Sequence, residues 1–130
     1  MKIMVCYDDS YASEKAIKHA MDHASEYGAD IYLVTSMVGG SEESADDIKK
    51  AEDALSQFQS QFEAKNIACE THLLIRGLSS GEDLVQFAEE NGIDQIYIGI
   101  EKRSKVGKLL FGSTAQYVIL EASCPVLTIK

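Results

Sequence analysis

Short apolar runs alternate along this chain with longer stretches in which apolar residues recur every three or four positions. The runs at 2–7, 31–38, 68–75, 93–98 and 125–129 have the length and composition of buried β-strands. The stretches between them have the periodicity of amphipathic helices. Strands that alternate with helices predict an α/β fold with one five-stranded parallel sheet, doubly wound with helices on both faces, in a single domain over residues 1–130.

The helix boundaries are predicted by capping residues. Ser10 is a suitable N-cap for the first helix, and Gly28 follows its last apolar residue as a C-terminal glycine would. A second helix is predicted around Ile48–Phe62, a third at about Gly81–Glu90, and Gly112 opens the last one. The segment from Gly99 to Gly112 is predicted to be a long loop.

The predicted winding indicates where a ligand would bind. With one helix per crossover the strand order becomes 3-2-1-4-5, so the first strand lies beside the fourth. Ligands of such sheets bind outside the carboxyl ends of the strands, where the winding reverses. The loops that follow these two strands, residues 7–10 and 99–114, are therefore expected to face each other.

The second of these loops has an unusual charge for this chain. The net charge is −9, yet four of the twelve basic residues lie within 102–108. The loop ends in Gly112-Ser113-Thr114 at a helix start, where backbone N–H groups and the helix dipole favour an anion. Phosphates near Gly112 and a ribose or base near Asp8 would suit a nucleotide. The plainer alternative is that Gly99 and Gly112 are turn and cap glycines, Ser113 is an ordinary N-cap, and the lysines belong to a solvated loop.

Several other classes of protein and site are disfavoured by the sequence. The acidic balance argues against nucleic-acid binding, and no apolar run approaches the ~20 residues of a membrane helix. The three cysteines are far apart and include no C-x-x-C pair, so neither disulfides nor a metal site is expected. His19 and His23 lie four apart on the first helix without a third partner, and no catalytic constellation emerges. The chain starts directly with a strand, and we predict a cytoplasmic protein.

Four segments together resemble the universal stress protein family over the full length of the chain. They are residues 3–10, 94–99, 106–118 and 122–127. ATP-binding members of that family carry the signature G-x-x-G-x9-G-[S/T]. Gly99 fits its first position and Gly112-Ser113 fit its last two, whereas Lys102 replaces the second glycine.

The resemblance implies a regulatory domain that binds ATP or AMP, with or without Mg²⁺, and acts in the stress response. It implies at most slow ATP hydrolysis. The expected nucleotide-binding residues are Tyr7 (through its backbone), Asp8, Gly99, Lys102, Gly112, Ser113 and Thr114. It also implies a homodimer that pairs through the last strand, Val126 to Ile129, and acts on a protein partner that the sequence does not identify. The alternative is a homodimeric interaction module of the same fold that does not bind nucleotide.

Overall fold

A computed structural model of the chain describes residues 1–40, 44–101, 103–105, 108–110 and 112–130. Its elements, in chain order, are β1 (Lys2–Cys6), α1 (Tyr11–Tyr27), β2 (Asp30–Ser36), α2 (Ala45–Ala64), β3 (Cys69–Leu74), α3 (Ser80–Glu90), β4 (Gln95–Gly99), β5 (Arg103–Lys105), β6 (Lys108–Leu110), α4 (Ser113–Glu121) and β7 (Val126–Ile129).

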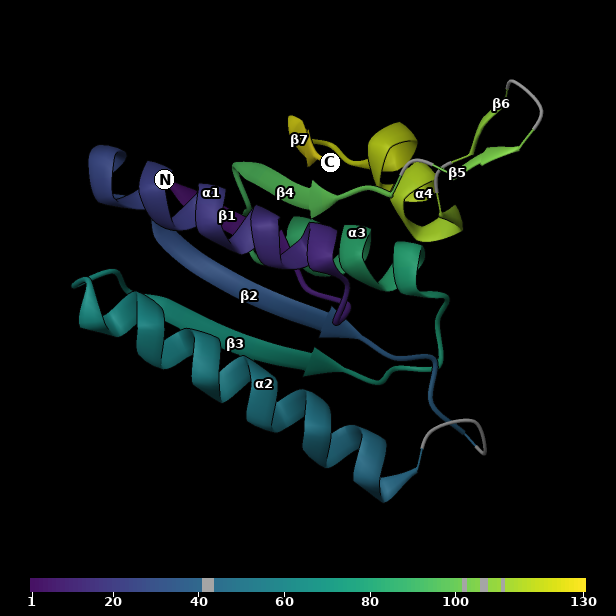
Figure 1. Cartoon of the computed structure of the whole chain (residues 1–130), viewed down its shortest axis with the longest axis horizontal. Coiled ribbons are helices and arrows are strands. Elements are labelled where there is room, and N and C mark those ends of the chain that lie inside the picture. The colour runs from purple at the N-terminus through teal and green to yellow at the C-terminus, as the bar shows by residue number, and fades with distance from the viewer. Residues whose placement is uncertain (41–43, 102, 106–107, 111) are drawn as a thin grey trace.

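Five strands form one parallel sheet in the order β3-β2-β1-β4-β7 (Figure 1). This is the predicted order 3-2-1-4-5, so the predicted fold class is confirmed. β1 lies at the centre, where Val5 is in register with Leu33 of β2 on one side and with Tyr97 of β4 on the other. The winding therefore reverses between β1 and β4.

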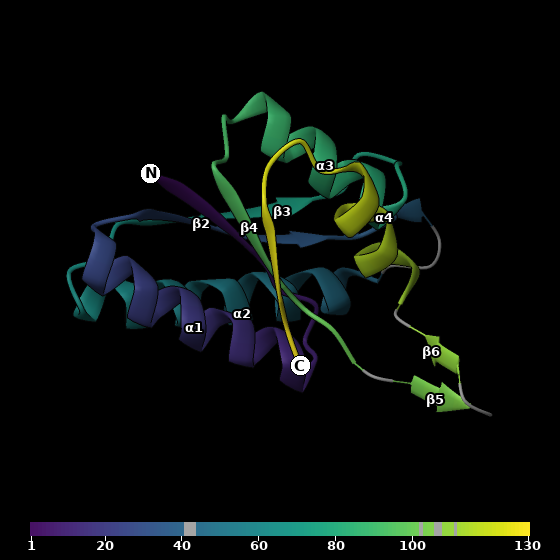
Figure 2. The same cartoon turned by 90° about the horizontal axis from the view of Figure 1, so that it is seen from above.

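Helices cover both faces of the sheet, α1 and α2 on one and α3 and α4 on the other (Figure 2). Each face has its own apolar core because successive strand side chains point to opposite faces. Val5 and Leu33 pack with Phe62 of α2 on the first face. Met4 packs with Val118 of α4 on the second. All five side chains are almost completely buried.

Serine side chains cap the first three helices. Ser10 Oγ accepts a hydrogen bond from Ser13 N at 3.1 Å, as the sequence predicts, and Ser44 and Ser79 act in the same way on α2 and α3. Gly28 ends α1 with a φ of 69°, a left-handed conformation that glycine adopts at little cost. The helix ends are therefore specified locally, as the sequence indicated.

The predicted long loop after β4 contains regular structure. β5 and β6 pair antiparallel, with Ser104 opposite Leu109, and this two-stranded unit projects away from the main sheet (Figures 1 and 2). The interpretation of the whole segment as a loop was wrong in this respect. Each strand has only three residues, which is too short for an alternating pattern to be distinguished from a loop.

Candidate functional site

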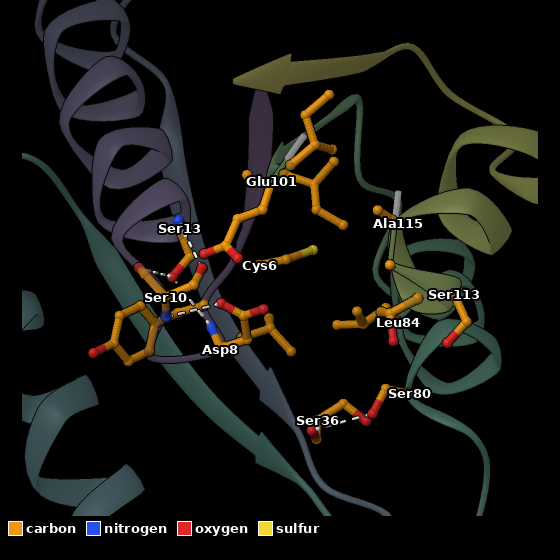
Figure 3. Close-up of a pocket in the computed structure, with 17 residues that line it drawn as sticks. Cys6, Asp8, Ser10, Ser13, Ser36, Ser80, Leu84, Glu101, Ser113 and Ala115 are labelled. Atoms are coloured by element: carbon orange, nitrogen blue, oxygen red, sulfur yellow. Dashed lines mark hydrogen bonds between the residues drawn. The ribbon is translucent and has the colours of Figure 1, made fainter. Parts of the chain in front are cut away.

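A cavity of about 330 Å³ opens at the carboxyl ends of β1 and β4 (Figure 3). It lies where the predicted fold places a ligand, between the turn after β1, the end of β4 and the start of α4. The residues lining it are Cys6, Tyr7, Asp8, Ser10, Ser13, Val34, Ser36, Ser80, Leu84, Ile98, Gly99, Ile100, Glu101, Gly112, Ser113, Thr114 and Ala115.

The turn after β1 holds Asp8 in a fixed position. Ser10 N donates to Asp8 Oδ1 at 3.0 Å, and Asp8 N donates to Ser13 Oγ at 3.4 Å. Ser13 Oγ in turn donates to the Ser10 carbonyl at 2.8 Å, so the turn and the first turn of α1 are linked. Asp8 therefore presents a carboxylate at the cavity wall that is already oriented before a ligand binds.

Tyr7 contributes to the site through its backbone position, because its side chain turns toward α2. Its hydroxyl donates to Asp9 Oδ1 at 3.1 Å, and its ring packs edge-on against Phe58 at 5.1 Å. Burial, followed by the hydrogen bond to Asp9, raises the pKa of the Tyr7 hydroxyl to about 12. Its N–H donates to the Val34 carbonyl, and its own carbonyl accepts from Thr35 Oγ1 at 2.8 Å. The backbone of Tyr7 is thus tied to β2.

Gly99 brings β4 into direct contact with the backbone of α1. A Cβ at this position would lie 2.4 Å from Ala12 C and 2.6 Å from Ser13 N. Real Cβ atoms do not come that close to other heavy atoms, so only glycine fits here without displacing α1. The glycine that the sequence suggested for ligand contact is therefore also required by the packing of the fold.

The start of α4 differs from the other helix starts because its N-cap is Gly112 and no side chain caps it. The plainer interpretation is wrong in making Ser113 the N-cap, because Ser113 is the first helical residue, whereas its assignment of Gly112 as a cap glycine is confirmed. Gly112, Ser113 and Thr114, which form this helix start, line the cavity. Uncapped amides at the positive end of the helix dipole are suited to hold a phosphate or carboxylate.

The structure brings six of the seven predicted binding residues to one cavity, namely Tyr7, Asp8, Gly99, Gly112, Ser113 and Thr114. Lys102 lies outside the described residues. Residues from both of the loops that were predicted to face each other therefore line a single cavity.

Several lining residues were not predicted. Ser80 Oγ donates to the Ser36 carbonyl at 3.4 Å, and Ser36 Oγ donates to Asp83 Oδ2 at 3.3 Å. Asp83 is fully buried and also pairs with Arg76 Nε at 2.5 Å. This network joins the end of β2 to the start of α3 at the cavity floor. No signal for this contact was present in the sequence, because Ser36 lies inside the predicted strand 31–38 and its contact with α3 depends on tertiary packing.

Cys6 forms an apolar part of the wall. Its side chain lies near Asp8 (Figure 3), and burial, with a smaller effect from Asp8, raises the pKa of its thiol to about 12. The thiol is therefore protonated near neutral pH, and it packs as a small apolar group rather than reacting as a nucleophile.

Metal-ligating groups do not cluster in the part of the chain that the structure describes: it holds no group of three or more His, Cys, Asp or Glu side chains placed to bind an ion. His23, on α1, hydrogen-bonds to the Tyr97 hydroxyl instead. Among the described helices, none is long and apolar enough to cross a membrane.

These features define a class of α/β domain in which a cavity at the switch point of the sheet is bounded by a carboxylate turn and by an uncapped helix start. The family model for the universal stress protein family matches residues 1–130. The chain belongs to the universal stress protein family, and the resemblance seen in the sequence is confirmed.

Relatives and solved structures agree with this assignment. A universal stress protein of Methanocaldococcus jannaschii is 34% identical over an alignment of 140 positions, which spans 99% of this chain and 81% of the relative. The structure of a universal stress protein from Archaeoglobus fulgidus is 40% identical with a TM-score of 0.89, covering 100% of this chain and 98% of the other. A second structure from that organism, in complex with dAMP, is 34% identical with a TM-score of 0.82 and the same coverage.

Proposed function

We propose that this protein is a cytoplasmic regulatory domain that binds an adenine nucleotide in the cavity between the β1 turn and α4, and that it acts in the stress response. One observation carries the proposal: the fixed carboxylate of Asp8 and the uncapped start of α4 line the same cavity of about 330 Å³. The A. fulgidus relative described as a complex with dAMP supports the choice of ligand class.

The proposal gives each part of the nucleotide a place that suits the chemistry of the walls. The phosphate lies at the amides and hydroxyls of Gly112, Ser113 and Thr114, which donate hydrogen bonds to its oxygens. The sugar hydroxyls donate to the Asp8 carboxylate. Mg²⁺ would accompany a polyphosphate and partly neutralise it. The ligand acts as a signal rather than as a substrate, so any hydrolysis is slow.

The test is calorimetric titration of nucleotide-stripped protein with AMP and with Mg-ATP, for the wild type and for Gly112→Leu. A Cβ at Gly112 meets no atom within 4 Å, so the variant should fold normally while its side chain obstructs the phosphate position. We expect saturable binding to the wild type and a loss of at least about 100-fold in the variant, since the charge-assisted hydrogen bonds of the helix start are blocked.

The matched control is Gln57→Leu, which places the same side chain at an exposed position of α2 on the opposite face of the sheet. This variant should bind like the wild type, and thermal unfolding should show that both variants are folded. Retained affinity in Gly112→Leu would refute the proposed phosphate position, and absence of heat with the wild type would refute nucleotide binding altogether.

A homodimeric interaction module is the second candidate, favoured by an exposed apolar surface. Tyr117, Ile119 and Leu120 on α4 are 39%, 37% and 77% exposed. Exposed apolar side chains that gather on one helix are typical of an interface. β7 forms the edge of the sheet beyond β4, and its outer backbone groups are available to a second copy. In this alternative the chain associates through these surfaces and the cavity does not bind nucleotide.

A further inference from the structure

Glu101 is the second residue after β4, and its side chain extends into the cavity. Figure 3 shows its side chain on the same wall as Asp8 and Ser13, whereas Ser113 and Leu84 lie across the cavity. Glu101 is exposed, so its carboxylate is solvated. In the signature G-x-x-G-x9-G-[S/T], Glu101 occupies the second x, a position at which the signature allows any residue.

One side of the cavity therefore carries the negative charge of two carboxylates. Asp8 and Glu101 are the charged residues among the lining residues given above. The favourable position for an anion is at the opposite side, where the first turn of α4 supplies amides and hydroxyls. A ligand that fits both sides carries one compact anionic group at one end and hydroxyl donors at the other.

We propose that Glu101 is a specificity-determining residue that makes this cavity select a nucleoside monophosphate over the corresponding triphosphate. This inference rests on the proposed function and names its ligand class. A monophosphate keeps its charge at α4 and leaves the sugar hydroxyls to donate to the carboxylate wall. A triphosphate carries about two further negative charges, which share the same partly enclosed space with Glu101 and are repelled by it.

The test compares the affinities of AMP and ATP, both without divalent cation, for the wild type and for Glu101→Gln. Glutamine keeps the size of the side chain and removes its charge. The wild type should prefer AMP, and the substitution should tighten ATP binding about tenfold and AMP binding by no more than about threefold, because repulsion scales with ligand charge. The gain for ATP should diminish with added salt, which screens this repulsion, and with Mg²⁺, which neutralises part of the triphosphate.

Glu26→Gln is the matched control. It removes the same charge from an exposed position on the last turn of α1 and should leave the ratio of the two affinities unchanged. An equal effect of Glu101→Gln on AMP and ATP, or no effect on either, would overturn the role of Glu101 while leaving nucleotide binding in place. Failure of the wild type and of Glu101→Gln to bind either nucleotide would instead overturn the proposed function, so the two failures are distinguishable.

Discussion

Buried ionisable side chains make the stability of this domain sensitive to alkaline pH. Burial is the main cause that raises the pKa of the Cys6 and Cys69 thiols from 9.0 to about 12, and of the Tyr7 hydroxyl from 10.0 to about 12. Between about pH 9 and about pH 12 the unfolded chain therefore binds fewer protons than the folded chain. These three groups contribute fully to the free energy of unfolding at pH values below their pKa in the unfolded chain. This contribution is lost as the pH rises through their pKa in the folded chain.

We therefore predict that the free energy of unfolding falls as the pH rises above about 9, by up to about 1.4 kcal/mol per pH unit for each such group. Urea unfolding at about pH 8 and about pH 10 measures the slope, and Cys6→Ala should make it shallower. Val5→Ala, at another buried position of β1, should lower stability equally at both pH values. A slope unchanged by Cys6→Ala would contradict the prediction.

At the scale of elements, the contact between β4 and α1 depends on the absence of a side chain at Gly99. The atoms that a Cβ would meet belong to the backbone of Ala12 and Ser13, which cannot rotate away as a side chain could. We expect Gly99→Ala to destabilise the fold by about 2 to 3 kcal/mol, since α1 must shift as a unit. Urea unfolding at neutral pH measures this.

Gly112→Ala provides the comparison, because a Cβ there meets open space and the φ of −60° suits any residue. Its stability should stay within about 0.5 kcal/mol of the wild type. Equal stability of the Gly99→Ala and Gly112→Ala variants would show that the β4–α1 contact is more adaptable than the distances indicate.

The elements that local patterns specify could be predicted from the sequence. Ser10 and Gly28 bound α1 as expected, because capping depends on a few neighbouring residues. The strand order followed from crossover rules rather than from any single residue. The pairing of β5 with β6 was missed because three-residue strands leave no periodic signal, and their register comes from backbone contacts.

The candidate site was predictable to the extent that topology determines it. The assignment of Asp8 and Gly112 to the site follows from the rule that ligands bind where the winding of the sheet reverses. Glu101 was missed because the direction of its side chain depends on how the chain leaves β4. The contact of Ser80 with Ser36 depends on the docking of α3, which joins residues 44 positions apart in the chain. The packing role of Gly99 could not be distinguished from a binding role without coordinates.

At the scale of the whole molecule, the edge of the sheet at β7 is the feature that bears on assembly. The amide of Ile96 in β4 donates to the carbonyl of Pro125, and the amide of Ile100, directly after β4, donates to the carbonyl of Ile129. Because hydrogen bonds alternate along a parallel strand, Val126 and Thr128 direct their amides to the outer edge. Those amides could pair with the same strand of a second copy, which would also cover the exposed side chains of α4.

We predict that the chain sediments at twice its own mass, and that Thr128→Pro shifts it toward the monomer. Proline removes the outward N–H and is tolerated at an edge strand, so pairing with β4 should survive. Thr128→Val, which keeps the N–H, is the control and should remain dimeric.

Each chain has a net charge of −9, so association brings two acidic surfaces together and should strengthen as salt is added. Sedimentation velocity at low and high salt measures both effects. A wild type that stays monomeric at high salt would exclude the dimer, and a Thr128→Pro variant that dimerises as well as the wild type would move the interface away from β7.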